Sequence, residues 1–535
     1  MLCDGVVLVD RPIVRERLRT PARHLDVLVE PDAEHIRHAA TASPDPLVSD
    51  ARLLDVSAGM LRRTLRGRLG LRGPVILTGH QAEFGHAGVF AKTIAVDALL
   101  RTLGGTGVFL AVDSDLPKTT HLAIPCLVAG RVRRRYVTIP GCDPRLPMDS
   151  QPAAPQDAWR AFFAQLAACV ERPQETLLPV FAEGLEAAQR PEVDFRDVVE
   201  RGHAAVERAL RLASPLHLRV SSLVRTPEFR AVVAHIVLRG REFAECYNAA
   251  QRAYRIRHKV RNRQRPAPVL NIERDRVELP FWIRRTGQRR HRLFVRIHGG
   301  RVEFFADDQP AGADDAARLG RASEHATPWA LERAGWQILP RALILSAFTR
   351  LLVSDLFVHG IGGAKYDEMT EDFARRFWGT PLPAACCISA TAYLPLPLSD
   401  ISDKTLAQIR RNRRDLHFNP QRHLANLPST LLERRTSLIQ QSRALRRARP
   451  ADRAARRRVF LELREVNHAL LHSDPEQAAA LERGWRDVER RARCDRIARD
   501  REVFFALHPR RVIEQLAERL RAALAPASEH RRGAP

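Results

Sequence analysis

A strand, a turn, a helix and a second strand follow one another near the start of the chain, and this order restricts the fold most. Residues 73–79 form a short apolar run that closes on Gly79, which predicts a buried strand. Apolar residues then recur at helical spacing over 88–103, and a second apolar run covers 108–112. Such a βαβ unit joins parallel strands, and open parallel sheets bind ligands at the carboxyl ends of their strands. The sequence therefore predicts an α/β fold with its chemistry at that edge.

The length of 535 residues predicts two to four domains. Long stretches with almost no glycine near the C-terminus predict a helical hairpin or coiled coil, with Phe460, Leu463, Leu470 and Leu471 on its apolar stripe. We expect the following segments: the first half of the core over 1–140, an inserted helical region with a small β part over 141–325, the second half of the core over 326–398, a helical coiled-coil arm over 399–500, a segment returning to the core over 501–525, and a disordered tail over 526–535.

The charge of the chain is strongly positive. It has 87 basic and 62 acidic residues, a net charge of +25 and a pI near 11.0, which taken alone favours a nucleic-acid partner. Only five of the 87 are lysine, so much of the arginine content reflects composition. We see no aromatic residues interleaved with the basic runs of the C-terminal helices, as base stacking requires. We therefore interpret the excess charge as a solvated helical face and expect no nucleic-acid partner.

The apolar pattern and the cysteines indicate the cellular compartment of such a chain. No run of about 18 apolar residues occurs, so we expect no membrane span, and the N-terminus lacks the pattern of a signal peptide. The cysteines are scattered without zinc spacing, and the one close pair, Cys386 and Cys387, lies in an apolar run typical of buried structural residues. We expect a cytoplasmic protein with no metal site and no membrane partner.

The first candidate segment runs from Thr78 through Gly79 to Gly88. It contains His80 and His86, and Lys92 follows one turn later. Backbone N–H groups at the start of the following helix, together with the helix dipole, favour a phosphate at such a turn. The order of residues matches neither a Walker loop nor a dinucleotide fingerprint. The alternative is a tight turn whose glycines serve packing only.

The second candidate segment holds two carboxylates, Asp113 and Asp115, directly after the second strand, with Lys118 and His121 following. Carboxylates spaced in this way can bind Mg²⁺ or orient an amine or a hydroxyl group. The alternative is that they cap a helix or lie solvated in a loop.

The third candidate segment begins at His359 and contains Gly360, Gly362 and Gly363 before Lys365 and Tyr366. Three glycines let the backbone approach a ligand closely, and the lysine and tyrosine could reach a phosphate or a carboxylate. The alternative is a flexible turn. Lysine is rare in this chain, and an ammonium is not equivalent to a guanidinium, so the occurrence of lysines in these segments favours a role in binding.

The order of these segments resembles that of the bacillithiol biosynthesis cysteine-adding enzymes, the cysteine ligases of low-molecular-weight thiol synthesis. The likeness rests on Val75-Ile-Leu-Thr-Gly-His-Gln-Ala82, on Val108-Phe-Leu-Ala-Val-Asp-Ser-Asp115 with His121, on Leu356-Phe-Val-His-Gly-Ile-Gly-Gly363, and on Phe505-Ala-Leu-His-Pro509 with Gln515. It spans nearly the whole chain. Gln81 is kept, whereas His80 replaces a glutamine and Lys118 stands in a region that is acidic in the family.

The resemblance implies a Rossmann-like core with inserted regions, a coiled-coil arm that joins two copies, and condensation of cysteine with the amino group of a glucosaminyl-malate. It implies ATP or ADP, with Mg²⁺, as cofactors and a small-molecule substrate. The expected catalytic residues are His80, Gln81, His86, Lys92, Asp113, Asp115 and His121, and the expected nucleotide- or substrate-binding residues are Thr78, Gly79, Gly88, His359, Gly360, Gly362, Gly363, Lys365 and Tyr366.

Among these residues, the turn, the two histidines and the lysines would neutralise phosphate. The aspartates would hold the incoming amine or Mg²⁺, and His121 would act as a general base. Two other functions stay open. One is an arginine-rich nucleic-acid-binding protein, and the other is a catalytically idle dimeric scaffold of the same fold.

Overall fold

The chain forms two compact units in a computed structural model that describes residues 13–42, 46–186, 190–262, 267–447 and 452–526. One unit, here called the body, comprises Met1–Ile124, Arg135–Leu394 and Arg501–Pro535. The other, here called the arm, comprises Pro125–Arg134 and Pro395–Asp500. All but the first residue of the tail expected over 526–535 lies outside the described residues.

A six-stranded sheet lies at the centre of the body, with the strand order β1-β17-β16-β4-β5-β10. The last five strands run parallel and β1 pairs antiparallel with β17, which confirms the predicted α/β fold with a parallel sheet. The strands are β1 (Val27–Glu30), β4 (Val75–Gln81), β5 (Thr106–Val112), β10 (Leu216–Arg219), β16 (Leu356–His359) and β17 (Ala384–Ala390).

Both faces of this sheet are covered by helices, which explains why its strands are apolar rather than alternating. Val75 and Leu77 of β4 belong to the large hydrophobic core, and Ile76 between them is also fully buried but faces the other way. On one face α4 (Ala87–Leu103) packs with α1 (Ala33–Thr41) and α19 (Arg510–Leu524). The core on the other face includes residues of α3 (Ala58–Arg68), α13 (Ala342–Leu352) and α14 (Ile361–Trp378).

The strand order reverses direction at β4. From β4 the chain proceeds to β5 and β10 on one side, and the later strands β16 and β17 lie on the other side. Thr78 joins the two sides, because its buried hydroxyl donates to Val358 O at 2.9 Å. The expectation that 141–325 is a pure insertion is wrong, since β10 from this region is a strand of the central sheet.

Asp355, just before β16, ties that strand to β4. Its buried carboxylate accepts hydrogen bonds from Arg62 at 2.6 Å, from Arg66 at 3.0 Å and from the backbone N–H of Val75 at 2.7 Å. Its own backbone N–H donates to Val75 O at 2.8 Å. One side chain therefore connects α3, the start of β4 and the start of β16.

The region between β5 and β16 contributes helices and a second sheet. This sheet is antiparallel, with the order β14-β13-β12-β11-β15, and it includes the small β part expected in this region. Its strands are β11 (Val277–Arg285), β12 (His291–His298), β13 (Arg301–Ala306), β14 (Gln309–Asp315) and β15 (Trp336–Pro340). The longer helices are α5 (Gln156–Ala167), α6 (Leu178–Glu186), α7 (Phe195–Ala209), α9 (Pro227–Leu238) and α10 (Gly240–Arg257).

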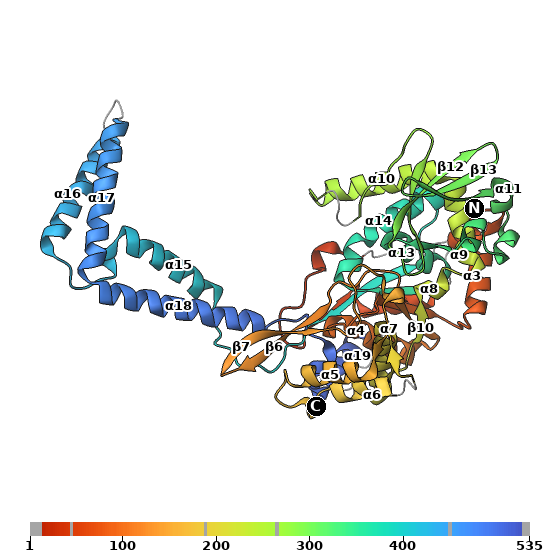
Figure 1. Cartoon of the computed structure of the whole chain (residues 1–535), viewed down its shortest axis with the longest axis horizontal. Coiled ribbons are helices and arrows are strands. Elements are labelled where there is room, and N and C mark those ends of the chain that lie inside the picture. Colours follow the sequence, from red (N-terminus) through yellow and green to blue (C-terminus); the bar gives the residue numbers. More distant parts are fainter. Residues whose placement is uncertain (1–12, 43–45, 187–189, 263–266, 448–451, 527–535) are drawn as a thin grey trace, which may run out of the picture. The chain divides into compact units, whose positions relative to one another are not determined.

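The arm contains four helices, α15 (Asp403–Phe418), α16 (Ser429–Arg447), α17 (Arg453–Ser473) and α18 (Pro475–Ala498), of which α16 and α17 lie side by side (Figure 1). Leu438, Val459, Val466 and Leu470 form their common core. The predicted apolar stripe is wrong at Phe460, whose side chain points away from this core and is 52% exposed.

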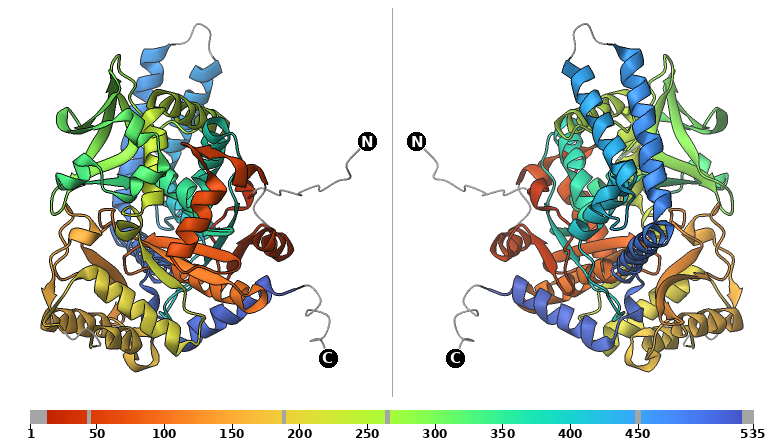
Figure 2. Two further views of the ribbon diagram at one scale, coloured as in Figure 1. Left: turned by 90° about the vertical axis from the view of Figure 1, so that its right-hand side faces the viewer. Right: turned by 90° about the vertical axis from the view of Figure 1, so that its left-hand side faces the viewer.

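The C-terminal segment belongs to the body. There α19, dark blue in Figure 2, packs against α4 and α1, although some 400 residues separate it from these helices. Three two-stranded sheets also occur among the described residues: β2 (Arg52–Leu53) with β3 (Val56–Ser57), β6 (His121–Val128) with β7 (Arg131–Thr138), and β8 (Ala154–Pro155) with β9 (Glu192–Val193). None of the helices described is both long enough and apolar enough to cross a bilayer.

The substitution Asp355→Asn should destabilise the body by roughly 3–5 kcal/mol, because it leaves the buried guanidinium of Arg62 without its counter-ion. Chemical denaturation followed by circular dichroism measures this change. Asp157→Asn is the matched control, since Asp157 is 91% exposed and its pair with Arg160 should contribute less than about 1 kcal/mol. Equal losses in the two variants would contradict the role given to Asp355.

Candidate functional site

Lys92 lies at the centre of the edge where β4 and β16 end. It belongs to the second turn of α4 and is 3% exposed, and its ammonium donates to Gly79 O at the end of β4. Its aliphatic chain comes within 3.9 Å of the point where Gly360 would carry a Cβ atom. Burial, reinforced by the charge of Lys118, lowers the pKa of Lys92 to about 7. Within the part of the chain that is described, no carboxylate pairs with it.

Lys365 belongs to the second half of the core, and its charge acts on the same buried residue as that of Lys92. The charges of Lys92 and Lys365 both draw down the pKa of Cys387 on β17, but burial outweighs them and raises this pKa to about 12. Cys386 and Cys387 are fully buried, as predicted, so neither is a nucleophile at neutral pH. The two lysines therefore share one buried neighbour, and Lys365 is held near it because its carbonyl accepts from Tyr254 Oη at 2.9 Å.

The glycine-rich segment is the start of a helix, so the alternative of a flexible turn is wrong. Gly360 is the N-cap of α14, and Gly362, Gly363, Lys365 and Tyr366 all lie within its first two turns. No side chain caps this helix, and its first turn contains no acidic residue. Its first N–H groups and its dipole thus favour an anion at the end of β16.

The imidazole of His359 is engaged within the fold. Its Nε2 lies 3.2 Å from the carboxylate of Asp367, which also pairs with the buried Arg350 at 2.5 Å. A Cβ atom at Gly363 would come within 2.8 Å of His359 Nδ1, so glycine is needed there for the ring to pack against the helix. Tyr366 packs on the hydrophobic core, and burial raises its pKa. These residues fix the start of α14.

The start of α4 is already capped, unlike that of α14. The N-cap is His86, whose Nδ1 accepts from the N–H of Gly88 at 3.0 Å. Burial and then the charge of Arg501 lower the pKa of His86 to about 3, so the ring stays neutral. The ring therefore offers no positive charge in the ligand-free protein, and the expected role of His86 toward phosphate stays a prediction.

Arg501 lies against the start of α4, and sequence reasoning missed it. A Cβ atom at Gly88 would come within 2.5 Å of its guanidinium, which donates to Ala390 O at 2.6 Å and to Ser389 Oγ at 3.1 Å. No described carboxylate forms an ion pair with it, and burial lowers its pKa. The residues around Arg501 do not distinguish it from the other arginines among the 82 of the chain. It shortly precedes the Phe505–Leu507 segment that carries part of the resemblance.

His80, Gln81 and Asp115 line the same edge toward β5. Burial and the nearby lysines hold the pKa of His80 well below its usual value, so this ring is neutral as well and does not supply the positive charge expected of it. The amide of Gln81 donates to Asp115 at 3.0 Å, and Arg290 pairs with the other carboxylate oxygen at 2.8 Å. Burial would raise the pKa of Asp115, but Arg290 and Gln81 outweigh it and lower the pKa.

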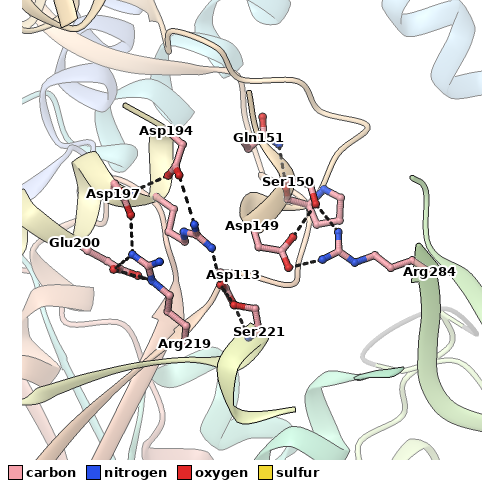
Figure 3. Close-up of polar contacts among 12 residues, drawn as sticks. Asp113, Asp149, Ser150, Gln151, Asp194, Asp197, Glu200, Arg219, Ser221 and Arg284 are labelled. Carbon is pink, nitrogen blue, oxygen red and sulfur yellow. Dashed lines mark hydrogen bonds and ion pairs between the residues drawn. The ribbon is translucent and has the colours of Figure 1, made fainter. Parts of the chain in front are cut away.

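Asp113 is a structural carboxylate (Figure 3). It is fully buried and accepts from the N–H of Ser221 at 2.9 Å, from the hydroxyl of Ser221 at 2.5 Å and from Arg196 at 3.2 Å. Beside it Asp149 pairs with the buried Arg284. Burial, together with the charge of Asp113, raises the pKa of Asp149. Both oxygens of Asp113 are therefore engaged within the fold and not solvated in a loop, and its expected role toward Mg²⁺ or an amine stays a prediction.

His121 lies apart from this site. It is the exposed first residue of β6, and its ring meets the edge of Tyr136 with the centroids 5.1 Å apart. Its expected role as general base stays a prediction. Across the residues that the structure describes, no three or more His, Cys, Asp or Glu side chains are arranged to hold a metal ion.

Comparison with known proteins gives no family for this chain. No protein-family model matches the sequence, and no curated protein matches it significantly. The site offers a ligand two buried or half-buried cations, Lys92 and Arg501, beside the uncapped start of α14.

Lys92 should make the stability of the body depend on pH above neutrality. Folded, Lys92 loses its proton near pH 7, whereas its ordinary value is 10.5, so between these values the unfolded chain binds the extra proton. The free energy of unfolding should therefore rise from pH 7 toward pH 10, by on the order of 4 kcal/mol.

Lys92→Met should lack this rise, which urea denaturation between pH 7 and pH 9.5 measures. Lys404→Met, which removes an exposed ammonium, should follow the unmodified protein. Parallel profiles for Lys92→Met and the unmodified protein would show that Lys92 is protonated in the fold.

Proposed function

We propose that this chain is an amide-forming ligase of the cysteine-adding type, which joins the carboxylate of cysteine or a similar amino acid to the amine of an amino sugar. The observation that carries the proposal is the pair of cations without carboxylate partners, Lys92 and Arg501, beside the uncapped start of α14. Withdrawing positive charge from water is costly unless an anion compensates it. Substrates that carry phosphate or carboxylate groups provide that anion.

The strand order supports a Rossmann-like core. In chain order the five parallel strands are arranged 3-2-1-4-5, and the reversal lies between β4 and β16. Doubly wound sheets bind their ligands in the crevice at such a reversal, outside the carboxyl ends of the strands. Gly79 directly follows the last residue of β4 that pairs with β16, and Gly360 directly follows β16. We further propose that the arm is a coiled coil that joins two copies of the chain.

A nucleotide such as ATP or ADP would supply a phosphate-containing leaving group that activates the carboxylate. In this proposal the N–H groups of α14, Lys365 and Arg501 hold the phosphate charge as it develops. Burial lowers the pKa of Lys92 to about 7, so its free amine is accessible at neutral pH. In this proposal that amine takes a proton from the substrate ammonium, and the substrate amine so formed attacks the activated carboxylate. Both roles come from this chain's own residues.

The carboxylates expected to bind Mg²⁺ do not fit that ion. Asp113 has its oxygens bonded to Ser221 and Arg196, and Asp115 has its oxygens bonded to Gln81 and Arg290. We therefore assign no step to a metal.

The ligase proposal predicts that the intact protein binds ATP or ADP. Isothermal titration with each nucleotide, with and without Mg²⁺, measures this binding directly. Mass spectrometry of a mixture with cysteine and glucosaminyl-malate should then show the mass of the two substrates minus one water. Failure to bind either nucleotide under all four conditions would sink the nucleotide-dependent mechanism.

The variant Arg501→Gln should raise the KM for the anionic substrate by about 10- to 100-fold, because a hydrogen bond from a charged donor is lost. Arg511→Gln is the matched control, since Arg511 is an exposed arginine of α19 outside the site. Gly88→Ala offers a second route to the same effect, because its Cβ atom would displace the Arg501 guanidinium. Unchanged KM values in both Arg501→Gln and Gly88→Ala would remove Arg501 from the site.

A further inference from the structure

One exposed face of α17 carries four large side chains in line. Arg453, Arg457, Phe460 and Arg464 follow one another at positions i, i+4, i+7 and i+11, which share one face of a helix. All four are exposed, and Phe460 is 52% exposed. The opposite face, with Val459, Val466 and Leu470, is buried in the core of the arm. We call these four residues the arginine stripe.

The start of the stripe lies in a strongly basic stretch of the chain. Residues 443–458 include eight arginines and a single acid, Asp452, which serves as the N-cap of α17 and accepts from Ala455 N–H at 2.9 Å. The first turn of α17 contains no acidic residue. Arginines there face the positive end of the helix dipole, which is the unfavourable arrangement. The folded arm alone gives no reason for this placement.

Some arginines of the same arm pair with carboxylates. Arg413 of α15 pairs with Glu482 at 3.2 Å and with Glu489 at 3.0 Å, and Arg499 pairs with Asp400 at 2.5 Å. By contrast, none of the three arginines of the stripe pairs with a carboxylate in the described residues. In the stripe such unpaired arginines lie on both sides of an exposed aromatic ring, Phe460.

We propose that the arginine stripe binds a single-stranded nucleic acid, with Phe460 stacking on a base while Arg453, Arg457 and Arg464 pair with its phosphates. An aromatic ring flanked by guanidinium groups on both sides is the arrangement that recognises unpaired nucleotides. A duplex hides the faces of its bases, and Phe460 would then have no partner. The expectation that no aromatic residue lies among the basic runs of these helices is wrong at Phe460, which lies exposed between Arg457 and Arg464 and not on the apolar face.

Fluorescence anisotropy of a labelled 12-nucleotide oligouridylate, titrated with the full-length protein from 50 to 200 mM salt, tests the proposal. Three phosphate contacts predict a slope of log K against log salt of about −2. Phe460→Ala should weaken binding by roughly 5- to 100-fold with the slope unchanged, because stacking does not release counter-ions. Replacing Arg453, Arg457 and Arg464 together by Gln should weaken binding and abolish most of the slope.

Two controls separate the proposal from general attraction and from self-association. The triple replacement of Arg483, Arg493 and Arg496 of α18 by Gln removes the same charge from exposed positions outside the stripe, and it should leave binding within about twofold. An equal loss in this control would overturn the proposal. It would also be overturned if Phe460→Ala halved the mass measured by light scattering and left oligouridylate affinity unchanged, because the stripe would then be a contact with a second copy.

Discussion

The carboxylate of Asp355 holds two neighbouring strands, β4 and β16, together at the centre of the body. It binds two arginines of α3 and the first N–H of β4, so β16 begins beside β4 and not at an edge of the sheet. The reversal of strand order lies between these two strands, and α4 and α14 both start near it. Every residue of the candidate site is positioned by one of these four elements or by β17, β5 and the segment that follows the arm.

The polar side chains of this edge differ in whether they form ion pairs within the fold. Those that do are structural, and those that do not are available to a ligand. Asp113, Asp115 and Asp149 each bind a guanidinium, so the acidic side chains of this edge are occupied by the fold itself. Lys92 and Arg501 instead donate to backbone carbonyls, and neither forms an ion pair with a carboxylate of the described residues. The edge is therefore suited to hold negative charge, and the catalytic group it offers is an amine of lowered pKa and not a pair of carboxylates.

The sequence predicted the elements whose pattern is local. Apolar runs and helical spacing located β4, α4 and β5, because both faces of a parallel sheet are buried. The four-residue strand β10 was missed because His217 and Arg219 make it too polar to resemble a buried strand. The glycines at 360–363 were compatible with a flexible turn, yet Gly360 occupies the N-cap position of α14 and Gly363 makes room for His359. The place of Arg501 in the site could not be predicted from the sequence, because it depends on a contact with Gly88, which lies more than 400 residues earlier.

The contact between α19 and α4 has a consequence for how this protein is made. Thirteen of the 17 residues of α4 are buried, and part of their cover is a helix that ends at Leu524. During translation the β4–α4–β5 unit leaves the ribosome first, and its final neighbour is synthesised last, after the whole arm. The apolar face of α4 that α19 covers therefore stays exposed during most of the synthesis of the chain. This exposure makes the nascent body a substrate for chaperones that shield such surfaces.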